Sequence, residues 1–409
     1  MSATHALEAP HPLRARYFTR GTLVLAALAA IGMAGYLYRL FFGLQAATNL
    51  SDAYPWGLWI SVDVASGVAL AAGGFTTAAL VEIAGRRRYH RLLRPALLTA
   101  MLGYTFVVIG LLADLGRYYN VWHPILPSMW QGSSVLFEVG MCVMIYLTVL
   151  YIEFMPLVIE RFKGRVALPG LLRLLNRPVE LLLGLADRFL RRFLVVFILA
   201  GVVLSCLHQS SLGTLMLIAP HKMHPLWYTS VSPLLFLLSA IAVGFPMVIF
   251  ESLLASRSFR LPPEIRLLGS LARLTPILLG AYLGVKIVDL TLRGAWGYLT
   301  DGSIESVMYL IETVGGVLLP MVLLSMRRVR RSARGLLTAA SLVIGGVVLN
   351  RINVFLVAYH PQFKERTYFP GPFEIAVTIG LAALLVLVYR LCVMLFPVVS
   401  AEPEPEASR

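Results

Sequence analysis

The stretch GLWISVDVASGVALAAGGFTTAALVEIAGRRRYHRLLR, residues 57–94, joins a long apolar run to a strongly basic loop. About 20 consecutive apolar residues are enough for a helix to cross the hydrocarbon core of a bilayer. Loops rich in arginine and lysine stay on the cytoplasmic side of the membrane. Residues 57–82 therefore predict a membrane span that ends in the cytoplasm, where the basic loop 85–94 follows it.

Similar apolar runs recur along the whole chain of 409 residues, which is 58% hydrophobic and 14% charged. A soluble domain contains about 25% charged residues. The sequence therefore predicts an all-α polytopic membrane protein. Its ten expected spans are residues 20–42, 57–82, 95–118, 132–158, 192–213, 231–254, 270–292, 304–326, 335–358 and 373–397.

Basic residues concentrate in every second loop, which accounts for most of the net charge of +14. The basic loops are residues 85–94, 160–192, 255–268 and 327–334. The loops between them, 43–56, 214–230, 293–303 and 359–372, contain few arginines or lysines. This alternation indicates orientation in a lipid bilayer rather than nucleic-acid binding, with both termini in the cytoplasm. Cys142, Cys206 and Cys392 lie in apolar segments without CxxC spacing and are expected to be packing residues.

A weak internal repeat suggests that spans 2–5 and 6–9 form two parallel four-helix bundles, flanked by spans 1 and 10. The order Asp, Arg, Glu occurs twice, as Asp114, Arg117 and Glu138 and as Asp289, Arg293 and Glu312. The expected units are a cytoplasmic tail (1–19), the first span and its loop (20–56), the first bundle (57–213), the second bundle (214–358), a loop and last span (359–397) and a disordered tail (398–409). Within the first bundle, residues 168–190 are expected to form an interfacial amphipathic helix.

Ionisable residues inside spans are costly and mark functional sites. The predicted topology brings one group to the outer half of the first bundle, where aromatic side chains border it. A lipid-soluble quinone needs such groups to hydrogen-bond its carbonyl oxygens and to exchange protons. The candidate quinone-binding residues are Trp59, Asp63, Asp114, Arg117, Tyr118, Glu138 and His208. The alternative interpretation is a structural ion pair between Asp114 and Arg117.

Glu138 and Glu153 lie 15 residues apart on the fourth span, so they share roughly one helix face about 22 Å apart. They are candidates for proton transfer together with Asp63, although interface anchoring explains Glu153 equally well. The second bundle contains a cluster of mixed charge, which is interpreted as structural ion pairs, including one between Lys286 and Asp289. Its members are Lys286, Asp289, Arg293, Glu312 and Arg351.

Histidines in the stretch CLHQSSLGTLMLIAPHKMHPLWY, residues 206–228, could bind haem, metal or quinone. A membrane b-type haem is usually held by two histidines on facing helices. His208 is the one histidine clearly inside an expected span, so no haem is predicted. His221 and His224 lie in an outer loop without a third ligand, so no metal site is predicted and a docking surface for a partner is preferred.

The stretches PWGLWISVDVASGVALAAGGF (55–75) and HQSSLGTLMLIAPHKMHPLWYTSVSPLLFLLSAIAVGFPMVIFES (208–252) resemble the NrfD/PsrC-type family of quinone-interacting membrane subunits. Within that family, the chain is most similar to the Ni/Fe-hydrogenase membrane subunits of the HybB type. The resemblance implies ten helices, no haem, and a quinone pocket in the first bundle at Asp63, Asp114, Arg117, Glu138 and His208. It also implies a bacterial inner-membrane subunit that exchanges electrons between menaquinone or ubiquinone and a periplasmic, ferredoxin-like iron–sulfur subunit.

The likeness to HybB-type subunits favours a Ni/Fe hydrogenase as the catalytic partner. The alternatives are a molybdenum reductase or a cytochrome-linked quinone reductase. A secondary transporter or a purely structural anchor remains a different class of interpretation. The chain is expected to act as the quinone-reactive subunit of an oxidoreductase complex, without a redox cofactor of its own.

Overall fold

The computed structural model describes residues 12, 13, 15–363 and 367–399 of the chain. These residues are almost entirely helical, and their one β interaction is an isolated bridge between Met223 and Tyr359. Within the described residues, ten helical segments are long and apolar enough to cross a membrane. The prediction of an all-α protein with about ten membrane helices is therefore confirmed. The expected tail residues 1–11, 14 and 400–409 lie outside the described residues.

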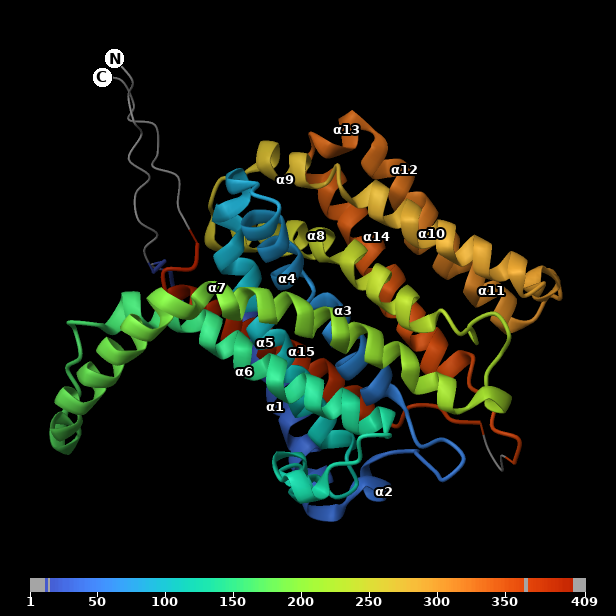
Figure 1. Ribbon diagram of the computed structural model, residues 1–409, viewed down its shortest axis with the longest axis horizontal. Coiled ribbons are helices and arrows are strands. Elements are labelled where there is room, and N and C mark those ends of the chain that lie inside the picture. The colour runs from blue at the N-terminus through green and yellow to red at the C-terminus, as the bar shows by residue number, and fades with distance from the viewer. Residues whose placement is uncertain (1–11, 14, 364–366, 400–409) are drawn as a thin grey trace.

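The first half of the chain contributes five candidate spans (Figure 1). Helix α1 is Arg20–Phe42 and is followed by the short α2, Leu44–Ala47. The second span, Trp59–Ile83, begins with a π-helical segment at Trp59–Ser66 and ends with another at Ala79–Ile83. Its remaining parts are α3 (Gly67–Leu70) and α4 (Gly73–Ala78), and the next helices are α5 (His90–Asp114), α6 (Val135–Phe162) and α7 (Asn176–Thr214).

The second half contributes the other five spans. They are built from α8 (Ser232–Phe259), α9 (Ile265–Leu271), α10 (Thr275–Leu292), α11 (Ile304–Leu310), α12 (Leu319–Ser325), α14 (Ala333–Ile352) and α15 (Pro372–Leu395). The short helix α13 (Arg327–Arg330) lies between the eighth and ninth spans. Two further π-helical segments lie at Ile311–Leu318 and Asn353–Val357. Loops add short 3₁₀ turns at Arg87–Tyr89, Tyr118–Asn120, His123–Ile125, Pro127–Met129, Gly170–Leu175, Leu215–Ile218, Pro220–Lys222 and Ala295–Leu299.

Helix α8 lies at the centre of the packing and joins the two halves. It contacts α4 and α7 from the first half and α10 and α14 from the second. The first and last spans, α1 and α15, pack along each other, and α15 also contacts α5. The last span is therefore part of the wall around the first half, which places its polar residues beside those of spans 2 and 3.

Two glycine pairs let backbones approach closely, as small residues do between membrane helices. A side chain added at Gly32 of α1 would collide with the backbone of Gly380 of α15. A side chain at Gly316 would likewise collide with Gly346 of α14. These contacts fix the spacing between span 1 and span 10 and between span 8 and span 9.

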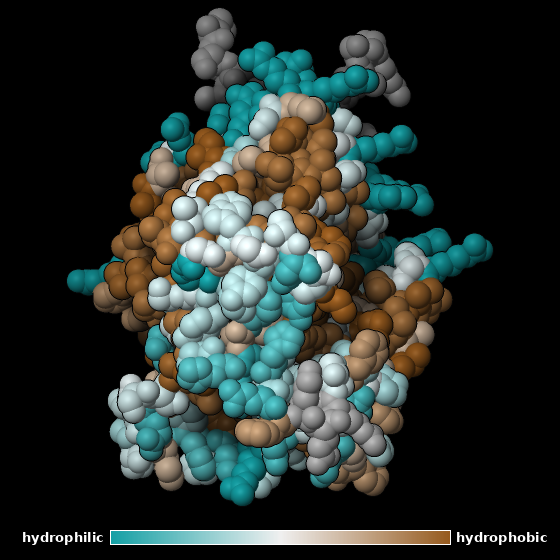
Figure 2. Space-filling model, turned by 90° about the vertical axis from the view of Figure 1, so that its right-hand side faces the viewer, coloured by the Kyte–Doolittle hydropathy of each residue, from teal (hydrophilic) through white to brown (hydrophobic). Residues whose placement is uncertain are grey.

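The surface has the character of a membrane protein. In the space-filling view, broad hydrophobic patches are exposed, and hydrophilic side chains project around them (Figure 2). Residues such as Leu23, Val195 and Ile277 are more than half exposed although they lie on candidate spans. Hydrocarbon is the environment that would cover such surface without free-energy cost.

Residues 168–190 do not form a separate helix, although one was expected for an interfacial segment. Residues 170–175 form a 3₁₀ turn, and α7 then continues without interruption from Asn176 to Thr214. The first part of α7 extends away from the other helices (Figure 1). The reason is that Pro178 falls in the first turn of α7, where a proline needs no hydrogen-bond partner and does not break the helix.

The two ends of the helices are distinguished by charge. The loops at 85–94, 255–268 and 327–334 define the arginine-rich end. The loops that precede spans 2, 4, 6, 8 and 10 define the arginine-poor end. The cytoplasmic position of the arginine-rich end, and the grouping of the spans into two parallel bundles, stay predictions.

Candidate functional site

Asp63 lies where the second span meets the last span, near the arginine-poor end. The Thr378 hydroxyl of α15 donates a hydrogen bond to Asp63 Oδ2 at 2.6 Å. Gly110 of α5 lies directly against the Asp63 side chain, where a larger residue would collide. Trp59, one turn earlier, is 1% exposed and donates from Nε1 to the backbone oxygen of Glu374 at 3.2 Å. Both residues belong to the π-helical segment Trp59–Ser66, and π-helical turns often occur at functional sites.

Asp114 is the last residue of α5, and its Oδ1 atom is buried without a hydrogen-bond partner among the described residues. The ion pair between Asp114 and Arg117, which was the alternative interpretation, is not formed among the described residues, and Arg117 is exposed. The reason is local: the backbone turns to an extended conformation at Leu115, so Arg117 does not follow Asp114 on the face of a helix.

Arg39 of α1 takes the place expected for Arg117. Its guanidinium is 1% exposed and donates to the backbone oxygen of Ala113 at 2.5 Å and to that of Leu115. It also lies 5.0 Å from the ring centroid of Tyr118, a cation–π distance. A buried cation is thus held beside the Asp114 carboxyl by the end of α5 itself.

Glu374, in the first turn of α15, is the third acidic side chain of this region. It is 1% exposed and accepts hydrogen bonds from the backbone nitrogens of Asn49 (3.0 Å) and Gly371 (2.7 Å) and from the Tyr368 hydroxyl. Burial raises the pKa of Tyr368, and the hydrogen bond to Glu374 adds to this, so the phenol keeps its proton. We call Trp59, Asp63, Asp114, Arg39 and Glu374 the outer cluster.

A cavity of about 560 Å³ opens next to the outer cluster at the arginine-poor end. Its wall includes Tyr54, Tyr368 and Phe369. Because Tyr368 also contacts Glu374, the cavity and the outer cluster share a wall. This is a place where a molecule from outside the helices could come close to the buried carboxyls.

Sequence reasoning missed Arg39, Tyr368 and Glu374 as members of this site. Arg39 and Glu374 are ionisable residues inside the first and last expected spans, which is the same signal that identified Asp63 and Asp114. They were missed because spans 1 and 10 were expected to flank the bundle, whereas α15 packs into it.

His208 lies deeper among the helices than expected. It is fully buried, its Nδ1 atom is 3.2 Å from the hydroxyl oxygen of Tyr104, and its Nε2 atom has no partner among the described residues. The Tyr104 ring in turn meets Tyr146 edge to face at 4.5 Å between centroids. Tyr104 precedes Asp114 by ten residues of α5, or about 15 Å along the helix. His208 and Asp114 are therefore not at one height, and the structure does not bring His208 to the outer cluster.

Glu138 and Glu153 lie along the contact between α6 and α7. Glu138 is on the side of His208 nearer the arginine-poor end, and Glu153 is on the side nearer the arginine-rich end. Glu138 accepts a hydrogen bond from Ser211 Oγ at 2.5 Å, but its side chain is exposed rather than turned into the bundle interior. Glu153 is half-buried against Gly201 of α7. Glu138, His208 and Glu153 thus form a discontinuous polar series along one helix contact, which we call the inner column.

The cluster expected in the second half is present but paired differently. Lys286 Nζ lies 2.5 Å from Glu312 Oε1, and the expected Lys286–Asp289 pair is not formed. Glu312 is 1% exposed and also accepts from Trp227 Nε1 (3.0 Å), Asn350 (2.9 Å) and Asn353 (2.9 Å). The carboxylate is therefore satisfied on both oxygens by charged and neutral donors.

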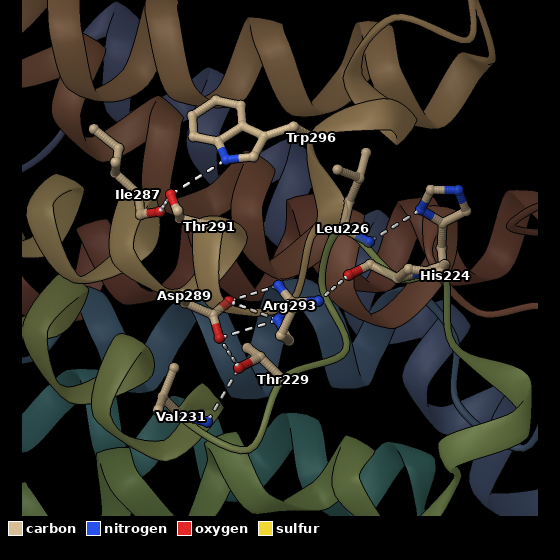
Figure 3. Close-up of polar contacts among 10 residues, drawn as sticks. His224, Leu226, Thr229, Val231, Ile287, Asp289, Thr291, Arg293 and Trp296 are labelled. Carbon is tan, nitrogen blue, oxygen red and sulfur yellow. Dashed lines mark hydrogen bonds and ion pairs between the residues drawn. The ribbon is translucent and has the colours of Figure 1, made fainter.

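Asp289 pairs instead with Arg293, four residues further along α10, at 2.5 Å (Figure 3). Thr229 donates to Asp289 Oδ1 at 2.5 Å, and Arg293 donates to the backbone oxygen of Pro225 at 2.5 Å. This group fastens the loop before α8 to the end of α10. Arg351 donates to Ser239 Oγ at 2.9 Å and to Asn350 Oδ1 at 2.5 Å, whereas its Nε atom is buried without a partner among the described residues.

His224 has a structural environment within the same loop. Its backbone nitrogen donates to the oxygen of Ala358 at 2.8 Å, and its ring nitrogen Nδ1 accepts from the Leu226 backbone at 3.3 Å. His360 lies beside it and its Nε2 atom is 3.1 Å from Glu305. His221 is exposed, so of the two predicted docking residues His221 is the more accessible.

A polytopic α-helical membrane protein with carboxyls buried beside aromatic rings near one end of its helices is the class that this fold and site define. The chain belongs to the NrfD family, because the family model described as "Polysulphide reductase, NrfD" matches residues 46–361. The predicted family resemblance is confirmed.

Three relatives show how far this likeness extends. A protein of Nitratidesulfovibrio vulgaris is 38% identical over 396 residues, covering 94% of this chain and 96% of its own. The probable Ni/Fe-hydrogenase 2 b-type cytochrome subunit of Escherichia coli K12 is 32% identical over 392 residues, covering 95% of each chain. The integral membrane subunit of menaquinone reductase from N. vulgaris is 30% identical over 178 residues, covering 43% of this chain and 38% of its own.

The E. coli relative is named a b-type cytochrome subunit, and a b-type cytochrome contains haem. The question is therefore whether the histidines of this chain could hold a haem. His208 has a free Nε2 atom and could serve as one axial ligand. Two histidines on facing helices are needed. Among the described residues, His90 is the other histidine on a candidate span, but it is exposed at the first residue of α5. The residues therefore do not fit a bis-histidine haem. No group of three or more potential metal ligands occurs in the described part of the chain either.

Proposed function

We propose that this protein is the quinone-reactive membrane subunit of a respiratory oxidoreductase complex that faces the periplasm. It exchanges electrons between a ferredoxin-like iron–sulfur partner and menaquinone or ubiquinone, and a Ni/Fe hydrogenase is the favoured catalytic partner. The names of the E. coli and N. vulgaris relatives support a role in a hydrogenase or menaquinone reductase complex. The arginine-rich loops support an inner-membrane location with both termini in the cytoplasm.

One observation carries this proposal: the half-buried Asp63 lies one turn from Trp59, and Asp114, at the end of α5, has one buried oxygen without a hydrogen-bond partner among the described residues. Reduction of a quinone to a quinol takes up two electrons and two protons. Buried carboxyls can hydrogen-bond a quinone oxygen and transfer those protons, and a ring such as Trp59 can pack against the quinone. Tyr118 and Arg117 flank this place at the end of α5, and Arg39 supplies a fixed positive charge.

The partner is proposed to dock on the arginine-poor end, because the outer cluster lies there. Electrons from an iron–sulfur centre would then need to travel only from the loop surface to the quinone. The cavity walled by Tyr54 and Tyr368, together with the loop that contains His221, forms part of that surface.

The inner column is proposed to conduct protons between the outer cluster and the arginine-rich end. His208 and Tyr104 lie between Glu138 and Glu153, which shortens each gap that a proton or a water molecule must cross. In this proposal His208 acts on the proton path. The prediction that His208 and Asp114 help to form one quinone pocket stays a prediction, and the distance of about 15 Å between their levels along α5 favours the proton path for His208.

The test compares quinone-linked with dye-linked activity of the purified complex, assembled from the full chain and its partner subunits. Asp114→Asn is expected to lower the quinone-linked rate by about 100-fold, the usual size of a general acid–base contribution, and to leave the dye-linked rate of the catalytic subunit unchanged. Asp301→Asn, which changes an exposed carboxyl at the same end, is the matched control. A wild-type quinone rate in the Asp114→Asn complex would overturn the assignment.

A secondary transporter is the competing class for buried charges in paired helical repeats. The same preparation separates the two classes, because a transporter subunit would support no electron transfer to quinone in any complex. No haem is included in the proposal, and a reduced-minus-oxidised spectrum with a stoichiometric b-type band would contradict that part.

A further inference from the structure

Five arginines gather around one cavity at the arginine-rich end. The cavity measures about 930 Å³ and lies between α9 and α13, which contact each other. Both helices appear at the top of Figure 1. Gly269 of α9 packs directly against the backbone of Arg330, which holds the two sides together. The arginines that line the cavity are Arg266, Arg273, Arg327, Arg330 and Arg331.

These arginines are not neutralised within the part of the chain that the structure describes. No acidic side chain there forms an ion pair with any of the five, whereas other arginines at this end do have such partners. The nearby Glu264 pairs with Arg91, and Glu160 pairs with Arg94. Burial lowers the pKa of Arg330, and repulsion from Arg273 and Arg327 lowers it further. Keeping like charges together has a cost that an external anion would remove.

The position of the cavity along the helices corresponds to the lipid headgroups. Arg327 follows the end of α12 at Ser325 by two residues, and α14 begins at Ala333. Arg266 is the second residue of the candidate span Ile265–Leu292, and Arg273 lies in the break between α9 and α10. Arginines at the ends of spans on one side of a membrane face the phosphate layer of the bilayer.

Apolar surface continues from the arginines toward the middle of the helices. Ile277 of α10, one turn beyond Arg273, is 70% exposed. Met326 and Val322, one turn apart beside Arg327, are 48% and 45% exposed. Helices α10 and α12 contact each other, so this charged cavity adjoins a paired apolar helix surface.

We propose that the cavity binds the phosphate headgroup of an anionic phospholipid whose acyl chains lie along α10 and α12. Planar guanidinium groups bind phosphate oxygens in pairs, and several of them can surround one or two phosphates. The adjoining apolar surface favours a lipid over a free phosphate ion, which would leave that surface without a specific partner. This inference is independent of the quinone reaction.

The test uses native mass spectrometry of the purified full chain in detergent, with cardiolipin, phosphatidylglycerol or phosphatidylcholine added. The wild type is expected to retain cardiolipin and phosphatidylglycerol under activation that removes phosphatidylcholine. Arg273→Gln/Arg327→Gln should lower the retained anionic lipid by about tenfold, because each arginine near a membrane surface contributes to attraction of anionic lipid. Both positions are exposed, so the substitutions should not prevent folding.

Arg87→Gln/Arg328→Gln is the matched control, since both arginines are exposed at the same end and neither lines the cavity. It should retain lipid like the wild type. Equal lipid retention by the cavity variant and the wild type would overturn the proposal. Displacement of the lipid by millimolar inorganic phosphate would also overturn it, because the site would then be one for a free anion. If the cavity variant does not fold, the single variants Arg273→Gln and Arg331→Gln decide by the same comparison.

Discussion

His208 and Tyr104 form a buried contact, with 3.2 Å between Nδ1 and the phenolic oxygen, about 15 Å along α5 from Asp114. We propose that the outer cluster and the inner column have separate roles, although one quinone pocket was expected to contain residues of both. The outer cluster offers carboxyls, a tryptophan and a cation near a cavity. The inner column offers a buried hydrogen-bonding ring in the middle of the helices, where we propose that a proton is relayed.

Replacing His208 tests the role of the inner column. His208→Gln keeps a hydrogen-bonding side chain of similar reach but cannot take up and release a proton. It is expected to lower quinone-linked turnover by at least about tenfold, while dye-linked activity of the partner stays intact. His123→Gln, in a loop at the arginine-poor end, is the control. Unchanged quinone turnover in an assembled His208→Gln complex would remove His208 from the account.

Glu138 is expected to couple quinone chemistry to charge movement across the membrane. Moving one charge against 100 mV costs about 2.3 kcal/mol, so a route through the protein matters energetically. Glu138→Gln preserves an acceptor for Ser211 but not a titratable group. In liposomes containing the whole complex, it should reduce the membrane potential formed during quinone reduction, or stop turnover. Glu82→Gln, also exposed, is the control. Normal turnover with normal potential would leave Glu138 as a structural partner of Ser211.

The Lys286–Glu312 pair should contribute strongly to the stability of the second half. Both side chains are buried, at 6% and 1% exposure. Removing one partner of such a pair typically costs about 3–5 kcal/mol, because the other charge stays buried alone. Lys286→Met and Glu312→Gln should each lower the unfolding temperature in detergent, and the double variant should regain part of the loss. A double variant whose loss equals the sum of the two single losses would show that the two charges do not depend on each other.

Acid should loosen the loop that contains His224. Burial lowers the pKa of His224 below its usual 6.5, repulsion from His360 acts in the same direction, and attraction by Glu305 and Asp301 opposes it. The folded loop therefore binds a proton less readily than the unfolded loop. Its stability is full above pH 6.5 and falls as the pH drops below that value.

Hydrogen exchange measures this effect at the His224 and His360 backbone amides, which bond to Ala358 and Lys222. After correction for intrinsic rates, both should be less protected at pH 5.5 than at pH 7.5. The difference should shrink in His224→Gln. Equal protection at the two pH values in the wild type would refute the prediction.

The spans could be predicted from sequence because hydrophobic length is a local property. The expected 20–42 and 304–326 agree with Arg20–Phe42 and Ile304–Ser325 to within a residue. Asp63 and Asp114 could also be identified, since a carboxyl inside an apolar run is itself the signal.

The pairings could not be predicted, because they depend on how helices end and which helices meet. Asp114 does not pair with Arg117, because the backbone is extended at Leu115. Arg39, which lies 75 residues earlier, instead packs beside Asp114 and donates to the backbone oxygens of Ala113 and Leu115. Lys286 likewise pairs with Glu312 on another span and not with Asp289 on its own helix. Spacing within one helix gives the neighbours that are available, but tertiary packing decides among them.

Photolabelling tests the central claim, a quinone site at the outer cluster, most directly. The purified complex is irradiated with a photoreactive quinone analogue, with and without excess menaquinone, and the labelled peptides are mapped by mass spectrometry. The account predicts labelling that menaquinone suppresses in the peptides containing Trp59–Ser66 and the end of α5 at Asp114. Labelling that menaquinone suppresses only in peptides from α8–α14 would contradict the account. Labelling that menaquinone does not suppress in any peptide would also contradict it.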